Sequence, residues 1–218
     1  MKREGWDSVI IAASGPSLTP EVAEEVRRTE QKKVIVVNDS WKLFPFANVL
    51  YACDARWWDV KGCGNFRGER WSNNNKELND NTECAKRHSL QLVEGKDGNE
   101  FCLEPGVICF GGNSGFQAIN LALQFGAKHI ILVGYDMRKV GTLNHFFGEH
   151  PPEFTGNDHY EFFCANFDAG AASLPKEYRI VNATAGSALN CFPKMSYAEA
   201  IRDRGLYCNW PVSNAAAG

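Results

Sequence analysis

Three histidines, His145, His150 and His159, stand close together in the stretch NHFFGEHPPEFTGNDHY. Imidazole is the side chain best suited to general-base chemistry near neutral pH, and long loops that carry such groups are often functional. We therefore predict that these histidines act as a general base or as partners of a phosphate group. A structural role is the first alternative, and a metal site is the second. The carboxylates available for such a metal site are Glu149, Glu153 and Asp158.

A glycine-rich turn, Gly111–Gly115, leads into an apolar stretch with helical periodicity. The free N–H groups and the dipole at the start of a helix attract anions, typically phosphate. The turn is followed by no Gly-Lys-Ser/Thr and is not GxGxxG, so a P-loop ATPase and a standard NAD enzyme are both disfavoured. We therefore predict a phosphate site of another kind at Asn113, Ser114 and Gly115.

A second corner of small residues follows the first apolar run of the chain. It comprises Ser14, Gly15, Pro16 and Ser17, where the backbone can come close to a ligand. Either corner alone is compatible with an ordinary strand-to-helix turn, but two of them in one chain favour a nucleotide site. Other polar residues directly after apolar runs are Asn38, Asp39, Asp54, Tyr135 and Asp136. The first three suit ribose hydroxyls or base edges.

The elements that must position these residues are short apolar runs of the kind buried on both faces of a parallel sheet. The predicted strands are Val9–Ala13, Lys33–Asn38, Asn48–Cys53, Val107–Phe110, His129–Val133 and Arg179–Asn182. Helices alternate with them, so we predict a Rossmann-like, doubly wound, mostly parallel α/β sheet. In such sheets ligands bind at the carboxyl ends of the strands, near the switch in strand order. The two corners are therefore expected to meet in one cleft.

Capping signals mark the predicted helices. Thr19 and Pro20 begin the helix at 20–29, and Asn113 begins the helix at 114–125, which Gly126 ends. Two more helices are expected at 158–169, capped by Asp158, and at 197–204.

The chain of 218 residues suits a single nucleotide-binding α/β domain spanning 1–218. The polar, Asn- and Gly-rich segment at about 59–105 is expected to be an irregular insertion, and the segment at about 138–170 a loop or lid. The aromatic and basic residues at the start of this insertion either contact a ligand or anchor it to the core. They are Trp57, Trp58, Phe66, Arg67, Arg70 and Trp71.

The formal net charge of −3 gives no general case for nucleic-acid binding through charge alone. No apolar run reaches the length of a membrane span, and the apolar run near the N-terminus is too short for a signal peptide. We therefore expect a cytoplasmic protein.

None of the eight cysteines has CxxC spacing. Unpaired thiols are the favoured interpretation, and a zinc site is the alternative. Its four ligands would be Cys63, Cys84, His88 and Cys102.

Three stretches together resemble a known family: VIIAASGPSL, VIVVND and NSGFQAINLALQFGAKHIILVGYDM. They are similar to the bacterial sialyltransferases that use CMP-sialic acid. They also resemble related phage and microbial domains grouped with flagellin-modifying glycosyltransferases and 6-hydroxymethylpterin diphosphokinase-like proteins. The resemblance covers residues 8–54 and 107–137, and extends more weakly through 157–193.

The resemblance implies a nucleotide-sugar-dependent glycosyltransferase that inverts the sugar's configuration and needs no metal for its chemistry. It places Gly15, Pro16, Ser17, Asn38 and Asp54 against the nucleotide. It also assigns Asn113–Gly115 to the phosphate and ribose, and His159 to the general base that deprotonates the acceptor hydroxyl. His145 or His150 would then help the departing phosphate.

This chain departs from the sialyltransferases at three places. Ser14 and Asp54 stand where the family has asparagine, and Arg138, Lys139 and His145 follow where the family has tyrosines that bind the departing phosphate. The segment at 145–152 is more similar to the phage relatives, which suggests a phage-encoded protein acting in a host cytoplasm. The resemblance leaves the acceptor as a glycan or a modified nucleic-acid base.

Two other functions stay open. One is an ATP- and Mg²⁺-dependent diphosphokinase, or another nucleotide-phosphate enzyme on the same fold, with Asp39, Asp54 and Asp136 as its carboxylates. The other is a non-catalytic module that binds a nucleotide.

Overall fold

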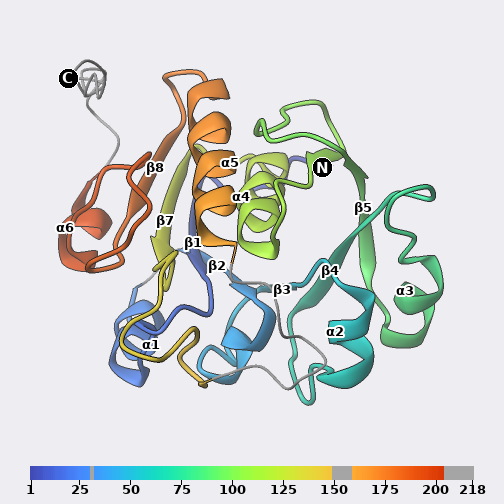
Figure 1. Ribbon diagram of the computed structural model, residues 1–218, viewed down its shortest axis with the longest axis horizontal. Helices are drawn as coiled ribbons and strands as arrows, with labels where there is room; N and C mark the ends of the chain where they lie inside the picture. The colour runs from blue at the N-terminus through green and yellow to red at the C-terminus, as the bar shows by residue number, and fades with distance from the viewer. Residues whose placement is uncertain (30–31, 149–158, 204–218) are drawn as a thin grey trace.

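The computed structural model describes residues 1–29, 32–148 and 159–203. An eight-stranded sheet in the order β6-β5-β4-β3-β2-β1-β7-β8 runs through the described chain (Figure 1). Every neighbouring pair of strands is parallel. The strands are β1 (Ser8–Ala12), β2 (Lys33–Val37), β3 (Val49–Tyr51), β4 (Glu69–Asn74), β5 (Gln91–Lys96), β6 (Val107–Cys109), β7 (His129–Val133) and β8 (Arg179–Asn182). The Rossmann-like α/β fold predicted from the sequence is confirmed.

The apolar strands are buried on both faces, as their unbroken hydrophobic runs predict. In β1, Val9 and Ile11 point into one core while Ile10 and Ala12 point into the other. Alternation of this kind divides the interior into two layers, one on each side of the sheet.

Helices cover both faces. α4 (Ser114–Phe125) and α5 (Tyr160–Ser173) lie side by side on one face (Figure 1), where Phe116 of α4 packs edge-on against Phe167 of α5. The opposite core takes residues from α1 (Pro20–Arg27), α2 (Ala55–Val60), α3 (Thr82–His88) and α6 (Tyr197–Arg202). A 3-10 turn, η1 (Asn38–Lys42), follows β2.

The predicted caps form. The side chain of Thr19 accepts a hydrogen bond from the Val22 backbone N–H, and that of Asn113 accepts one from the Phe116 N–H at 2.9 Å. Gly126 ends α4 in the left-handed conformation that favours glycine. α5 begins later than predicted, at Tyr160, and the predicted cap Asp158 lies outside the described residues.

The segment at 59–105 corrects the sequence prediction, because it is part of the sheet rather than an irregular insertion. It contributes β4, α3 and β5. β4 escaped prediction because its buried positions include Ser72 and Asn73, which are polar but hydrogen-bonded. The Asn73 amide donates to Gln117 of α4, and the Ser72 hydroxyl donates to the Ala52 carbonyl. Both polar side chains therefore keep a hydrogen-bond partner when they are buried. The aromatic residues Trp58, Phe66 and Trp71 anchor this segment in the two cores.

The strand order reverses at β1. The chain moves outward from β1 through β2 to β6, and α4 then returns it to β7 on the other side of β1. The loops after β1 and β7 therefore diverge at the carboxyl edge of the sheet, which is where open α/β sheets bind ligands.

Among the described residues, no helix combines the length and the apolar character needed to cross a membrane.

Candidate functional site

A cavity of about 530 Å³ opens at this switch point, at the carboxyl ends of the central strands. Both predicted corners contribute to its wall, since Ser14 and Gly15 line it together with Asn113, Ser114 and Gly115. The other predicted residues that line it are Asn38, Asp54, Asp136, Arg138, Lys139, His145 and His159. Predicted residues as far apart in the sequence as Ser14 and His159 thus converge on one site, as the topology predicts.

The corner after β1 is held against the turn after β7. The Gly15 N–H donates to the Gly134 carbonyl at 2.9 Å, which continues the β1–β7 pairing beyond the strands. A side chain at position 15 would collide here, because a Cβ would lie 2.0 Å from Asp136 Oδ2 and 2.5 Å from the Gly134 oxygen. Glycine is therefore required by close packing at this corner.

Asp136 is the polar centre of this junction. Its Oδ2 accepts hydrogen bonds from the Ser17 hydroxyl at 2.7 Å and from the Ser17 N–H at 3.3 Å. Burial raises the pKa of the Asp136 carboxyl, while the bonds from Ser17 act in the opposite direction. Its other oxygen, Oδ1, is buried without a hydrogen-bond partner among the described residues.

The segment after β8 clamps the same turn from the other side. The Tyr135 N–H donates to the Thr184 hydroxyl at 3.0 Å, and the Ser187 hydroxyl donates to the Tyr135 carbonyl at 2.5 Å. Asn182 in turn donates its amide to Ser187. Three buried polar side chains thus fix the backbone that carries Asp136 into the cavity wall, which makes this wall rigid.

The start of α4 offers backbone N–H groups to the cavity. The Asn113 side chain caps the Phe116 N–H, but the first N–H groups of a helix have no partner within the helix. Because Ser114 and Gly115 are the first two residues of α4 and line the cavity, this end of the helix can receive an anion. The Ser114 hydroxyl is already engaged, since it donates to Cys53 Sγ and accepts from the Cys53 N–H, both at 3.1 Å.

Two residues of the cavity wall have strained backbones. Asn38 follows β2 with φ 50°, and Met137 follows the turn after β7 with φ 49°. In the described chain only Ser89 joins them as a non-glycine residue with positive φ. Such strain is retained where the surrounding structure enforces it, and it is concentrated at functional sites.

Two of the three histidines reach the cavity. His145 lies on the loop after β7, with its ring stacked on Phe147 at a centroid distance of 4.9 Å, and His159 is exposed just before α5. The Tyr160 hydroxyl donates to Asn144 at 3.1 Å and so fastens this loop to α5. The third histidine, His150, lies outside the described residues.

Comparison of the sequence with models of protein families and with curated proteins finds no match. Among solved structures, the chain is similar to the MAf glycosyltransferase from Magnetospirillum magneticum AMB-1, with a TM-score of 0.59 and 12% sequence identity. The match covers 90% of this chain and 34% of that protein, so the chain spans about a third of its length. At this identity the likeness concerns the fold, which is the α/β fold described above.

Four predicted site residues lie outside the cavity lining of the described chain: Pro16, Ser17, Asp39 and Tyr135. Ser17 supports Asp136 instead, and the Tyr135 hydroxyl donates to the Gly115 carbonyl at 3.0 Å within the core. The buried carboxylate of Asp39 pairs with Lys42 and accepts from Trp57 Nε1 at 3.2 Å. Asp54 does line the cavity, and its carboxylate caps α2 by accepting from the Arg56 N–H.

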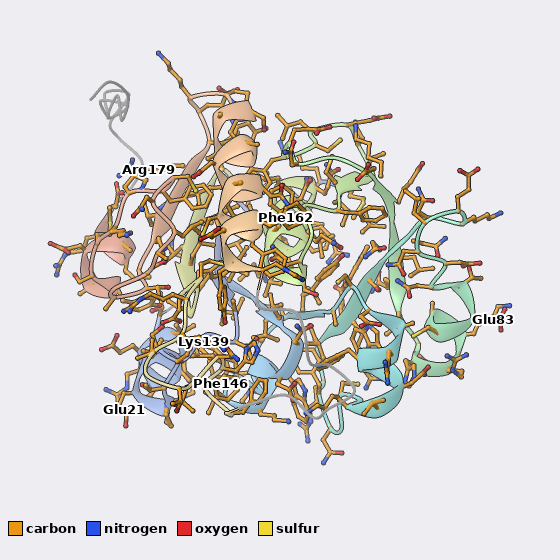
Figure 2. All side chains as sticks on the ribbon, viewed as in Figure 1. Glu21, Glu83, Lys139, Phe146, Phe162 and Arg179 are labelled. Carbon is orange, nitrogen blue, oxygen red and sulfur yellow. The ribbon has the colours of Figure 1, made fainter. Side chains whose placement is uncertain are left out.

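Several cavity residues escaped the sequence prediction. They are Cys53, Met137, Asn144, Tyr160, Phe162 and Phe163. Trp57, which the sequence left as either a ligand contact or an anchor, is buried and also lines the cavity. Phe162 is on the first turn of α5, and Lys139 is on the loop after β7; both line the cavity and both are labelled in Figure 2. The one signal that could have identified Cys53 is its position at the carboxyl end of the predicted strand Asn48–Cys53, two residues after β3.

The four-ligand zinc arrangement of the sequence prediction is not formed. Cys102 lies in the core beneath α4, whereas Cys63 and Cys84 lie in the core on the opposite face of the sheet. None of the seven cysteines of the described chain forms a disulfide bond.

Proposed function

We propose that this protein is a nucleotide-sugar-dependent glycosyltransferase that transfers a sugar to an acceptor hydroxyl. One observation carries the proposal: the Ser14–Gly15 corner, the start of α4 and two histidines line one cavity of about 530 Å³. A cavity of this size suits a ligand as large as a nucleotide sugar. The fold it shares with a glycosyltransferase supports the choice of this reaction class.

In this proposal, the donor phosphate binds at the start of α4. The N–H groups of Ser114 and Gly115 hydrogen-bond the phosphate oxygens, and the helix dipole favours their negative charge. Asn38 and Asp54 face the nucleoside with an amide and a carboxylate. Gly15 and Gly134 pack against each other in the same wall, which keeps the corner after β1 in place beside the donor.

His159 is proposed as the general base. It precedes the first turn of α5 and is exposed, so an acceptor can reach it from solvent while the donor occupies the cavity. A neutral imidazole would take the proton of the acceptor hydroxyl as that oxygen attacks the sugar carbon and the bond to the phosphate breaks. His145, Lys139 and Arg138 line the same cavity and would stabilise the charge that develops on the departing phosphate.

A magnesium-dependent diphosphokinase receives less support. It requires carboxylates that converge on one ion, and Asp39, Asp54 and Asp136 were the candidates. Asp39 is turned to Lys42 and Trp57 away from the cavity lining, Asp54 caps α2, and Asp136 receives two bonds from Ser17. Among the described residues, these three carboxylates do not gather into a group that could share one ion.

The test is a transfer assay with a panel of CMP-, UDP- and GDP-sugars, with hydrolysis of the donor as a second readout. Wild-type protein should consume one donor class, and His159→Ala should lower kcat at least about 100-fold. Glu161→Ala, an exposed change on the first turn of α5 and outside the cavity lining, serves as the control. Absence of transfer and hydrolysis with every donor, or an undiminished rate in His159→Ala, would overturn the proposal. Strict dependence on ATP and Mg²⁺ would favour the diphosphokinase.

A further inference from the structure

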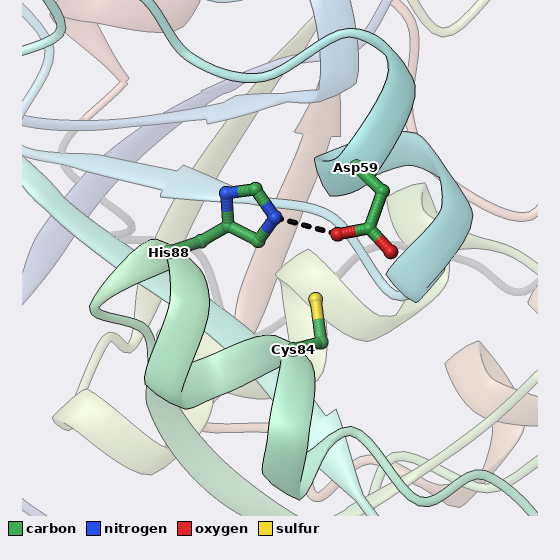
Figure 3. A group of neighbouring side chains, drawn as sticks. All are labelled: Asp59, Cys84 and His88. Carbon is green, nitrogen blue, oxygen red and sulfur yellow. Dashed lines mark hydrogen bonds and ion pairs between the residues drawn. The ribbon is translucent and has the colours of Figure 1, made fainter.

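A second group of reactive side chains lies between α2 and α3, which pack against each other. Asp59 is near the end of α2, and Cys84 and His88 are four residues apart on α3, so both face the same side of that helix. One ligand atom from each of the three lies within 4.8 Å of the others. Figure 3 shows Cys84 Sγ pointing toward the gap between the His88 ring and the Asp59 carboxylate.

We infer that Asp59, Cys84 and His88 form a zinc site. Thiolate, imidazole and carboxylate are the three donor types that bind Zn²⁺ in proteins, and three protein ligands with one open position make a complete set. Cys84 is buried, while the carboxylate of Asp59 is partly exposed, so an ion can enter from solvent and keep a water as its fourth ligand.

The geometry needs only local adjustment. Around a tetrahedral zinc, ligand atoms are roughly 3.3–3.6 Å apart, as the Zn–N, Zn–O and Zn–S bond lengths require. His88 Nε2 and Asp59 Oδ1 are 2.7 Å apart, so they would separate slightly as the ion enters. The most distant pair within the 4.8 Å limit would close by about 1 Å, which side-chain rotation can supply.

Arg87 completes the site as a supporting residue. Its guanidinium donates to both oxygens of Asp59, at 2.9 Å to Oδ2 and at 3.1 Å to Oδ1, so it can keep Oδ2 while Oδ1 turns to the ion. Ligating carboxylates are commonly held by such an outer hydrogen bond. The Cys84 thiolate and the Asp59 carboxylate together would balance the two positive charges of zinc, with His88 bound through an unprotonated ring nitrogen. The proton of the Cys84 thiol would leave for solvent on binding.

The site would fasten α2 to α3. Asp54 and Trp57, at the start of α2, line the cavity, whereas Asp59 is near the other end of this short helix. Bound zinc would therefore hold the helix that carries part of the cavity wall. The inference does not depend on the proposed transferase activity, since metal binding is measured directly.

The experiment uses the full chain without a histidine tag, stripped with a chelator and dialysed against Zn²⁺ or Co²⁺. Wild-type protein should retain one zinc per chain, and Co²⁺ should give the near-ultraviolet band of thiolate-to-cobalt charge transfer. Cys84→Ala should lose the band, and His88→Gln should bind Zn²⁺ at least about 10-fold more weakly. Cys164→Ala, which removes a half-buried thiol on α5, should bind like wild type.

Circular dichroism melting of each apoprotein verifies that the variants are folded. The inference is overturned if wild-type protein retains no zinc and shows no cobalt–thiolate band, because Asp59 then serves only Arg87 and His88. It is also overturned if folded Cys84→Ala keeps the band.

Discussion

The Ser17 hydroxyl donates a 2.7 Å hydrogen bond to the carboxylate of Asp136, which is only 1% exposed. This bond joins the corner after β1 to the turn after β7, at the point where the strand order of the sheet reverses. Because these two corners form one wall of the cavity, the shape of the cavity depends on how tightly they are held together.

Gly15→Ala should destabilise the protein by about 3 kcal/mol or more. A Cβ there would lie 2.0 Å from Asp136 Oδ2 and 2.5 Å from the Gly134 carbonyl oxygen, and a backbone atom cannot move away easily. Urea unfolding measures the change in the free energy of unfolding. Gly106→Ala is the control, because position 106 has open space but a φ of +85°, and it should cost only about 1–2 kcal/mol. Equal losses in the two variants would contradict the close approach at Gly15.

Asp136→Asn should change how stability depends on pH. Burial raises the pKa of Asp136 in the folded protein, so the folded state keeps this proton to a higher pH than the unfolded chain does. The carboxyl therefore contributes a loss of stability that grows as pH rises from about 4 toward neutrality. The asparagine variant lacks this loss, so its stability relative to wild type, measured as the free energy of unfolding, should be greater at pH 7 than at pH 4. An identical difference at both values would contradict the raised pKa.

Asn113→Ala and Thr19→Ala form a matched pair of helix caps. Each side chain accepts a backbone N–H at the start of its helix, and each loss should cost about 1 kcal/mol of stability. Asn113 lines the cavity, whereas Thr19 is outside its lining in the described chain. Only Asn113→Ala should therefore weaken nucleotide binding, which calorimetric titration can measure. If both variants bound nucleotide equally weakly, the loss of affinity would follow from lower stability and not from a contact at Asn113.

Phe162→Ala should weaken ligand binding with little change in stability. Phe162 is 58% exposed at the cavity, so its removal exposes no core, but an aromatic ring at this place can stack on a base or a sugar. A stacking contact is worth roughly 1–3 kcal/mol, which corresponds to a loss of about 5- to 150-fold in affinity. Leu78→Ala, at a residue 62% exposed outside the cavity lining, should change neither quantity. Unchanged affinity in Phe162→Ala would remove Phe162 from the site.

The predictable part of this fold is the part made of apolar runs and capping residues. β1, β2, β7 and α4 follow from unbroken hydrophobic stretches and from Asn113 and Gly126, because burial on both sides of a parallel sheet leaves a strong pattern. The two corners could be predicted to meet because the carboxyl ends of parallel strands lie at one edge.

The remainder depends on contacts between distant residues. β4 is a strand whose buried Asn73 is satisfied by Gln117, a partner 44 positions away that no local pattern reveals. The sequence around Asp39 does not distinguish a ligand-binding aspartate from a structural one. In the fold its carboxylate pairs with Lys42 and accepts a hydrogen bond from Trp57. The approach of Asp59 to Cys84 and His88 likewise depends on how α2 packs against α3. No local pattern reveals this packing, so the sequence predicted Cys63 and Cys102 as the partners of Cys84 and His88.

The central claim is that the switch-point cavity binds a nucleotide, and a thermal-shift screen tests it most directly. The panel contains CMP, UMP, AMP and GMP with their sugar and diphosphate forms, each with and without Mg²⁺. The nucleotides that carry one particular base should raise the Tm by roughly 5–10 °C when each is present at about 100 times its own Kd. That rise should shrink in Asn113→Ala and persist in Thr19→Ala. A Tm that no member of the panel raises, or an equal rise in Asn113→Ala and wild type, would contradict a nucleotide site in this cavity.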